Sequence, residues 1–140
     1  MTLRPLLWPA LLLVSLNSLA ASPKPLFVDR STATVMDAAT AQALWTAQVP
    51  AKVWKLYPAK KWGYLSQVEG GFTQDKLCVV TARAMMLPIA VGGRTLVFKP
   101  EKTATAFDAL PGATQEQCRE LAKAKLTEAI DAVVSDLVKN

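Results

Sequence analysis

Residues 114–137 read TQEQCRELAKAKLTEAIDAVVSDL, a pattern that predicts one long amphipathic helix. Thr114 and Gln117 have the spacing of a capping box, in which each side chain satisfies a backbone N–H group of the other residue. Apolar side chains then recur at steps of three and four residues and form one stripe. Such a stripe must be buried against other elements. Its members are Cys118, Leu121, Ala122, Leu126, Ala129, Ile130, Val133, Val134 and Leu137.

Four strand-like segments precede this helix and offer a surface on which it could pack. The second is the strongest, because apolar and β-branched residues follow one another almost without interruption. Gly70 and Gly71, inside the first, predict a bulge or a close backbone approach. Short connections favour antiparallel neighbours, since parallel strands need long crossovers. The segments are residues 62–73, 76–87, 94–99 and 102–107.

A shorter helix is expected before the strands, over residues 37–49, with Asp37 as its N-cap and Pro50 at its end. A second short helix or turn is expected over residues 51–57. The predicted fold class is therefore α+β: an N-terminal helix, an antiparallel meander of about four strands, and a long C-terminal helix packed on one face of the sheet. Residues 37–140 form its single domain.

The N-terminus has the three parts of a cleavable secretory signal in residues 1–20. A short region with Arg4 is followed by a leucine-rich apolar run and then by small residues. The run is much shorter than the roughly 20 residues that a membrane-spanning helix needs. We expect cleavage after Ala20, or after Ala21 as the second choice. Residues 21–36 would then be an extended, loosely held leader, and the mature protein would be periplasmic or secreted rather than integral to a membrane.

Two cysteines, Cys78 and Cys118, are the only ones in the chain. An even number of cysteines in an exported protein indicates a disulfide, because that compartment is oxidising. The alternative is two buried free thiols. A bond between them would attach the start of the C-terminal helix to the strongest strand.

Most catalytic chemistries find no support in this sequence. The chain has no histidine, which removes histidine-based triads and most zinc sites. Ser66 stands in an ordinary strand pattern without an activating motif. No spacing indicates a metal site or a cofactor, and no pattern brings two carboxylates together for glycoside hydrolysis. The acidic residues considered for that chemistry are Glu69, Asp75, Glu101 and Asp108.

One segment, residues 52–64, combines aromatic and basic side chains without a single acid. Tryptophan and tyrosine supply rigid contact area, and lysines favour an anionic partner. The alternative is that the aromatics are core residues while the lysines face water. The candidate binding residues are Trp54, Lys55, Tyr57, Lys60, Lys61 and Trp62, flanked by Lys52 and Tyr64.

A second candidate is the apolar stretch 85–91, which contains Met86 and Pro88 and is expected to join two strands. If exposed, it would mark an interface, and Met86 would make that surface adaptable. The alternative is that it folds back over the end of the sheet.

These observations predict a small exported binding protein that is not an enzyme and needs no cofactor. Its formal net charge of +5 is too small and too scattered to indicate nucleic acid. One hypothesis is an inhibitor or immunity protein that neutralises a toxin or a wall-degrading enzyme, with another envelope or secreted protein as its partner. The alternative is an accessory module that binds an anionic envelope polymer or other envelope component through the Lys/Trp-rich segment.

Overall fold

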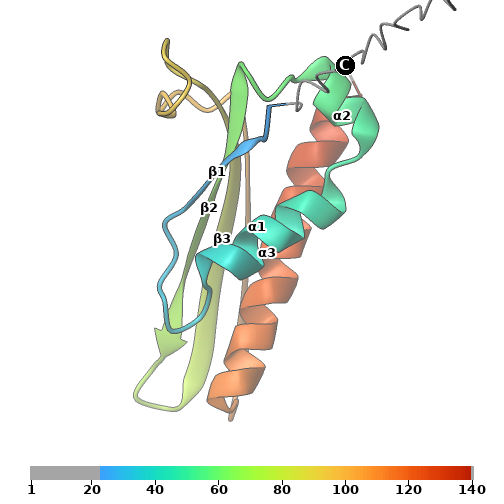
Figure 1. Cartoon of the computed structure of the whole chain (residues 1–140). Helices are drawn as coiled ribbons and strands as arrows, with labels where there is room; N and C mark the ends of the chain where they lie inside the picture. The colour runs from blue at the N-terminus through green and yellow to red at the C-terminus, as the bar shows by residue number, and fades with distance from the viewer. Residues whose placement is uncertain (1–22, 140) are drawn as a thin grey trace, which may run out of the picture.

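The computed structural model describes residues 23–139 and has two layers, a mixed sheet and a layer of helices on one of its faces (Figure 1). The strands lie in the order β1 (Leu26–Asp29), β2 (Trp62–Phe72), β3 (Leu77–Pro88) and β4 (Lys102–Pro111). The helices are α1 (Ala38–Gln48), α2 (Ala51–Leu56) and α3 (Gln115–Val138). The α+β class is confirmed. The signal predicted for residues 1–20 and its cleavage site lie outside the described residues.

Helix α3 has the packing that its sequence predicts. The capping box is present, with the Gln117 N–H donating to the Thr114 hydroxyl and the Thr114 N–H donating to the Gln117 side chain. The stripe faces β3 and β4, and Leu121 and Val134 lie half-buried along its flanks. The fully buried members are Cys118, Ala122, Leu126, Ala129, Ile130, Val133 and Leu137.

The two short helices also begin and end where local signals place them. The Asp37 carboxylate accepts a hydrogen bond from the Thr40 N–H at 2.8 Å and caps α1. Pro50 separates α1 from α2, because its ring has no place in a helix interior. Within residues 23–139, no helix is both long and apolar enough to cross a membrane.

The leader expected at residues 21–36 is not simply loose, since it contains β1. This strand pairs parallel with β2, with Phe27 opposite Tyr64, whereas the meander β2-β3-β4 is antiparallel. The prediction of a wholly antiparallel sheet was therefore wrong at this edge. The physical reason is that α1 and α2 form a crossover, which lets the chain return to the sheet in the same direction.

The strand expected at residues 94–99 is absent. This segment is a loop with one isolated bridge between Ile89 and Leu96, and it follows Gly92 and Gly93, both at positive φ. Leu96 packs on a small second core on the sheet face opposite the helices, formed by Leu65, Met85 and Leu87. Burial of one leucine, rather than strand pairing, is what anchors this segment.

Of the two alternatives for the pair Gly70 and Gly71, a bulge or a close backbone approach, the structure shows a close approach at Gly70. The register of β2 with β3 continues unbroken through Gly70 and Val80, so the strand has no bulge there. A Cβ atom on Gly70 would lie 2.7 Å from the carbonyl oxygen of Val79. A side chain at this position would push the two strands apart.

The predicted disulfide is present. Cys78 on β3 and Cys118 in the first turn of α3 are bonded, with their Cα atoms 5.7 Å apart, and both are fully buried. The bond joins the sheet layer to the helix layer and links two residues that are 40 positions apart in the sequence.

Candidate binding groove

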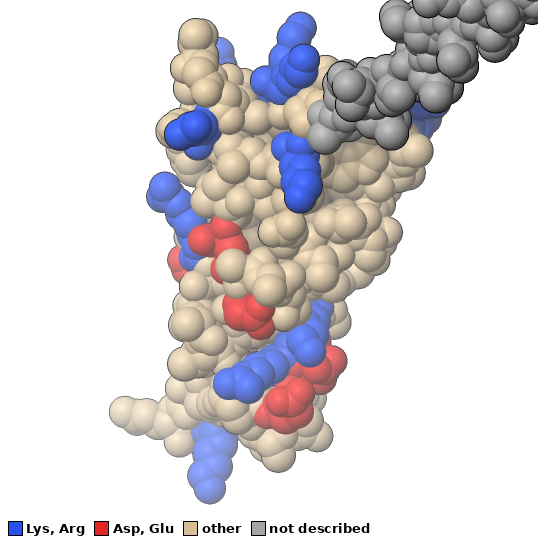
Figure 2. Space-filling model, in the orientation of Figure 1, with Lys and Arg blue, Asp and Glu red and all other residues tan. Residues whose placement is uncertain are grey.

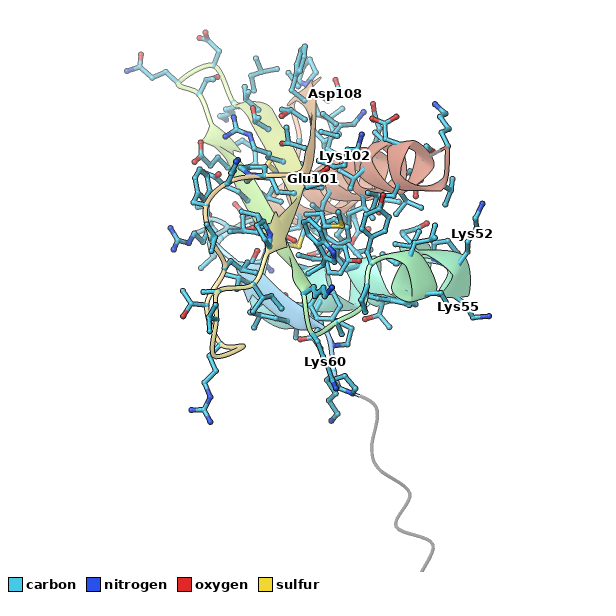
Figure 3. The ribbon with its side chains drawn as sticks, turned by 90° about the horizontal axis from the view of Figure 1, so that it is seen from above. Lys52, Lys55, Lys60, Glu101, Lys102 and Asp108 are labelled. Carbon is cyan, nitrogen blue, oxygen red and sulfur yellow. A yellow bond between two sulfur atoms is a disulfide. The ribbon has the colours of Figure 1, made fainter. Side chains whose placement is uncertain are left out.

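The aromatic and basic segment 52–64 forms one end of the molecule, comprising α2, the following turn and the start of β2. Its four lysines, Lys52, Lys55, Lys60 and Lys61, are exposed. None of the ion pairs of the described residues involves them, and Lys52 donates only to the carbonyl of Val138 at 3.4 Å. In Figure 3, Lys52 and Lys55 project from the outer surface of α2, and Lys60 projects near the β1 side of the sheet.

The aromatic side chains of this segment divide between core and surface. Tyr64 is fully buried and belongs to the core. Trp54 is half-buried and lies edge-on to Phe27 and to Tyr64, with ring centroids 6.4 and 5.3 Å away. Tyr57 and Trp62 are half-buried and stack edge to face on each other at 5.9 Å. Neither sequence alternative holds for all of them, because each indole keeps one surface accessible.

An apolar groove of about 570 Å³ runs beside Trp54. Its volume falls within the range of ordinary small-molecule sites. Phe27 and Trp54 form its aromatic part, and Lys24 is its one charged lining residue. Lys55 and Lys60 do not line the groove, but each directly follows a lining residue in the chain, Trp54 and Ala59. The lining residues are Pro23, Lys24, Pro25 and Phe27, Gln42 and Thr46 of α1, and Trp54, Pro58 and Ala59.

The charge around this end of the molecule is positive. On the face drawn in Figure 2, Asp and Glu lie in the middle and lower parts, whereas the charged side chains visible in the upper part are Lys and Arg. Clustered charge of one sign raises the local concentration of oppositely charged ligands.

A second hollow, of about 260 Å³, lies between the start of α1 and α3 and carries both charge signs. Its charged groups are already used locally. Asp37 caps α1, and hydrogen bonds from the backbone and side chain of Thr40 lower the pKa of its carboxyl. Arg119 donates to the carbonyl of Thr34 at 3.0 Å, and Lys123 pairs with Glu120 at 2.7 Å. This hollow is a product of helix capping and surface ion pairs.

The other residues considered from the sequence lie away from the groove. Met86 is fully buried within β3, and residues 85–88 are strand rather than loop, so the first part of the stretch 85–91 is buried, whereas Val91 at its end is fully exposed. Ser66 is buried and accepts a hydrogen bond from the Trp45 indole at 2.9 Å, which is a structural role. Across residues 23–139, no three His, Cys, Asp or Glu side chains are grouped as a metal site would require.

Six of the nine lining residues of the groove lie outside the segment 52–64 and were not foreseen from the sequence. Phe27 and the prolines of the leader form one wall, and Gln42 and Thr46 of α1 contribute to another. The leader carried a usable signal, because an apolar LFV run between prolines and Asp29 fits a short strand. Nothing local marks Gln42 or Thr46, whose contribution depends on how α1 crosses the sheet.

No known protein family matches this sequence, and no curated protein matches it. Among solved structures, the chain is similar to a PelC dodecamer from Paraburkholderia phytofirmans, at 16% identity and a TM-score of 0.34, over 84% of this chain and 90% of that one. It is also similar to a minor lipoprotein from Acinetobacter baumannii, at 10% identity and a TM-score of 0.33, over 81% of this chain and 88% of that one. A third similar structure is a DUF330 protein from Xanthomonas campestris, at 11% identity and a TM-score of 0.35, over 85% of this chain and 88% of that one. Similarity at this level does not establish a shared family.

Proposed function

We propose that this protein is an exported binding protein without enzymatic activity, and that it holds an anionic lipid of the cell envelope in the groove beside Trp54. The observation that carries the proposal is an apolar groove lined by Lys24, with the exposed Lys55 and Lys60 next to lining residues in the chain and none of the three in an ion pair of the described residues. The apolar part of the ligand would contact Phe27 and Trp54. Its anionic group would meet Lys24, Lys55 and Lys60.

Export is supported by two independent features. The signal expected at residues 1–20 directs the chain out of the cytoplasm. The Cys78–Cys118 bond is of a kind that persists in oxidising compartments and is rare in the cytoplasm. A periplasmic or secreted location follows from the two together, and an envelope lipid is an abundant anionic and apolar ligand at that location.

The groove favours a lipid over a purely ionic polymer. A polyanion without apolar groups would use the lysines and leave the aromatic wall in contact with water. An amphiphile satisfies both parts of the site, because burial of apolar surface and attraction between charges then act together. An inhibitor of a toxin or a wall-degrading enzyme stays a hypothesis from the sequence.

The test is binding of the mature protein to vesicles of anionic phospholipid, with zwitterionic vesicles as the reference. We expect binding to the anionic vesicles that weakens as salt rises. Lys55→Glu together with Lys60→Glu should weaken it by roughly tenfold or more. Arg83→Glu is the control, because Arg83 is also exposed but lies on the sheet face opposite the helices, and it should leave binding nearly unchanged.

Trp54→Ala tests the apolar wall separately, with Trp62→Ala as its control. Only the Trp54 variant should lose affinity, since Trp62 does not line the groove. Equal losses in Trp54→Ala and Trp62→Ala, or equal losses in Arg83→Glu and the lysine variants, would contradict the proposed site. Retention of one envelope protein at moderate salt, without any vesicle binding, would favour the inhibitor hypothesis instead.

A further inference from the structure

Strand β4 is an open edge of the sheet. It stands last in the strand order, and the Ala109 N–H donates to the carboxylate of Asp108 at 2.8 Å rather than to β3. Backbone groups of alternate residues in an antiparallel pair point to opposite sides. The N–H and C=O groups of Thr103, Thr105 and Phe107 therefore point away from β3, as those of Ala109 do.

This edge lacks the features that normally keep a strand from pairing. Between residues 103 and 107 it has no charged residue and no proline, and its register with β3 runs unbroken from Pro111 to Lys102. Natural edge strands are usually shortened, bulged, charged or covered. On the sheet face away from the helices, Phe107 is 79% exposed in the middle of this strand.

The sequence of β4 is complementary to itself in one antiparallel register. Centred on Thr105, this register sets Thr103 opposite Phe107, so the outward backbone groups of both copies meet each other. It also sets Lys102 opposite Asp108, and an opposite-charge pair across strands is stabilising. Thr103 and Phe107 form a pair of β-branched and aromatic side chains, which is favourable as well.

We propose that β4 pairs with β4 of a second copy of this chain, antiparallel and centred on Thr105, so that one continuous sheet runs through both copies. The interface is isologous, because each patch contacts the same patch on the other copy. Three residue pairs would exchange about six backbone hydrogen bonds. The pairing ends at Ala109, whose N–H group is already capped by Asp108.

The charges needed for this register are available. Lys102 is half-buried and takes part in none of the ion pairs of the described residues. Asp108 has a neighbouring cation, Lys125, at 3.5 Å, which still leaves its carboxylate half exposed. Figure 3 shows Lys102 and Asp108 at the β4 side of the sheet, away from β1 and Lys60. A dimer formed there leaves both lipid grooves open, so this inference does not depend on the proposed ligand.

The test is sedimentation velocity of the mature, oxidised protein over a wide concentration range. Thr105→Pro removes an outward N–H group that does not bond to β3, and proline is tolerated on the free side of an edge strand. Thr105→Val is the matched control, because it keeps the N–H group and the β-branched shape. We expect the wild type and Thr105→Val to dimerise, and Thr105→Pro to raise the dissociation constant at least tenfold. Thermal melting of Thr105→Pro, measured on the monomer, serves as the control that this variant is folded.

The register has a test of its own. Lys102→Glu places two acids opposite each other, so it should weaken the dimer several-fold more than Lys102→Gln, and this difference should vanish at high salt. Amides of Thr103, Thr105 and Phe107 should gain protection from hydrogen exchange as concentration rises. A wild type that is monomeric at every concentration, or a dimer insensitive to Thr105→Pro, would overturn the proposal. Equal dissociation constants for the two Lys102 variants would overturn this register.

Discussion

Replacement of Tyr64 by phenylalanine should make this protein more stable. The Tyr64 side chain is fully buried, with ring centroids of Trp45, Trp54 and Phe27 at 4.8, 5.3 and 5.8 Å. Its hydroxyl has no hydrogen-bond partner among the described residues. The ring therefore supplies the packing, while the hydroxyl contributes only the cost of leaving water.

The size of the effect follows from that cost. A buried polar group without a partner costs about 1–3 kcal/mol in proteins. Phenylalanine keeps the ring and removes the hydroxyl, so Tyr64→Phe should raise the free energy of unfolding by about 1–2 kcal/mol. Tyr57→Phe is the matched control. Tyr57 is only half-buried, and its substitution should change stability by less than about 0.5 kcal/mol.

The same hydroxyl predicts a dependence on pH. Burial, with a smaller contribution from Tyr57, raises the pKa of the Tyr64 phenol above its ordinary value of 10.0. Above pH 10 the unfolded chain releases this proton and the folded chain does not, so stability falls as pH rises through that range. Phenylalanine has no proton to release. The stability gap between Tyr64→Phe and the wild type should therefore widen above about pH 10 and stay constant below it.

The measurement is urea unfolding of the wild type and both variants at neutral pH and again above pH 10. Comparison of Tyr64→Phe with the wild type at each pH removes the effect of every ionisation that the two proteins share. If Tyr64→Phe lost more than about 1 kcal/mol at neutral pH, the hydroxyl would have a partner in solution and the reasoning would be wrong. A gap independent of pH would refute the pKa argument alone.

Three further variants test the core, each measured by urea unfolding. Ser66→Ala leaves the buried Trp45 indole N–H without its acceptor and should cost about 1–3 kcal/mol; a neutral result would mean that the 2.9 Å hydrogen bond contributes nothing. Joint replacement of Cys78 and Cys118 by alanine removes a cross-link between residues 40 positions apart, and the chain-entropy estimate predicts a loss of about 4 kcal/mol in the free energy of unfolding. The wild type under reducing conditions should lose the same amount. Val133→Asp places an unpaired charge in the buried stripe of α3 and should cost more than about 3 kcal/mol, whereas a loss below about 1 kcal/mol would mean that this face of α3 is not buried.

Elements with strong local signals were predicted accurately from the sequence. The capping box at Thr114, the N-cap at Asp37 and the break at Pro50 each act through neighbouring backbone groups, so the sequence contains the whole interaction. The period of the α3 stripe also identified which side chains are buried. The same logic holds for β2 and β3, whose apolar patterns continue over many residues.

The errors fall where an element depends on a distant partner. β1 has four residues and owes its existence to pairing with β2 after a crossover of more than thirty residues. Residues 94–99 have a strand-like composition, yet their placement depends on Leu96 reaching a small core on the far face of the sheet. Short segments carry too little periodicity to show which surface they will meet.

The candidate site shows the same division. The sequence identified the lysines and aromatics of residues 52–64, because their density without acids is visible in one window. It left open whether Trp54 is core or surface, and the structure shows that it is partly both. The groove itself could not be predicted, since Phe27, Thr46 and Trp54 belong to three separate elements.

Four features could be inferred from the chain alone: the α+β class, the limits of α1 and α3, the stripe that α3 buries and the two cysteines of the disulfide. Each of these depends on groups a few residues apart, or on composition. Three other features became visible in the folded molecule alone: β1 joins the sheet in parallel, a groove lies beside Trp54, and β4 is a free edge. Those features depend on how separate layers pack and which backbone groups remain unpaired, and packing between distant residues leaves no local pattern in the chain.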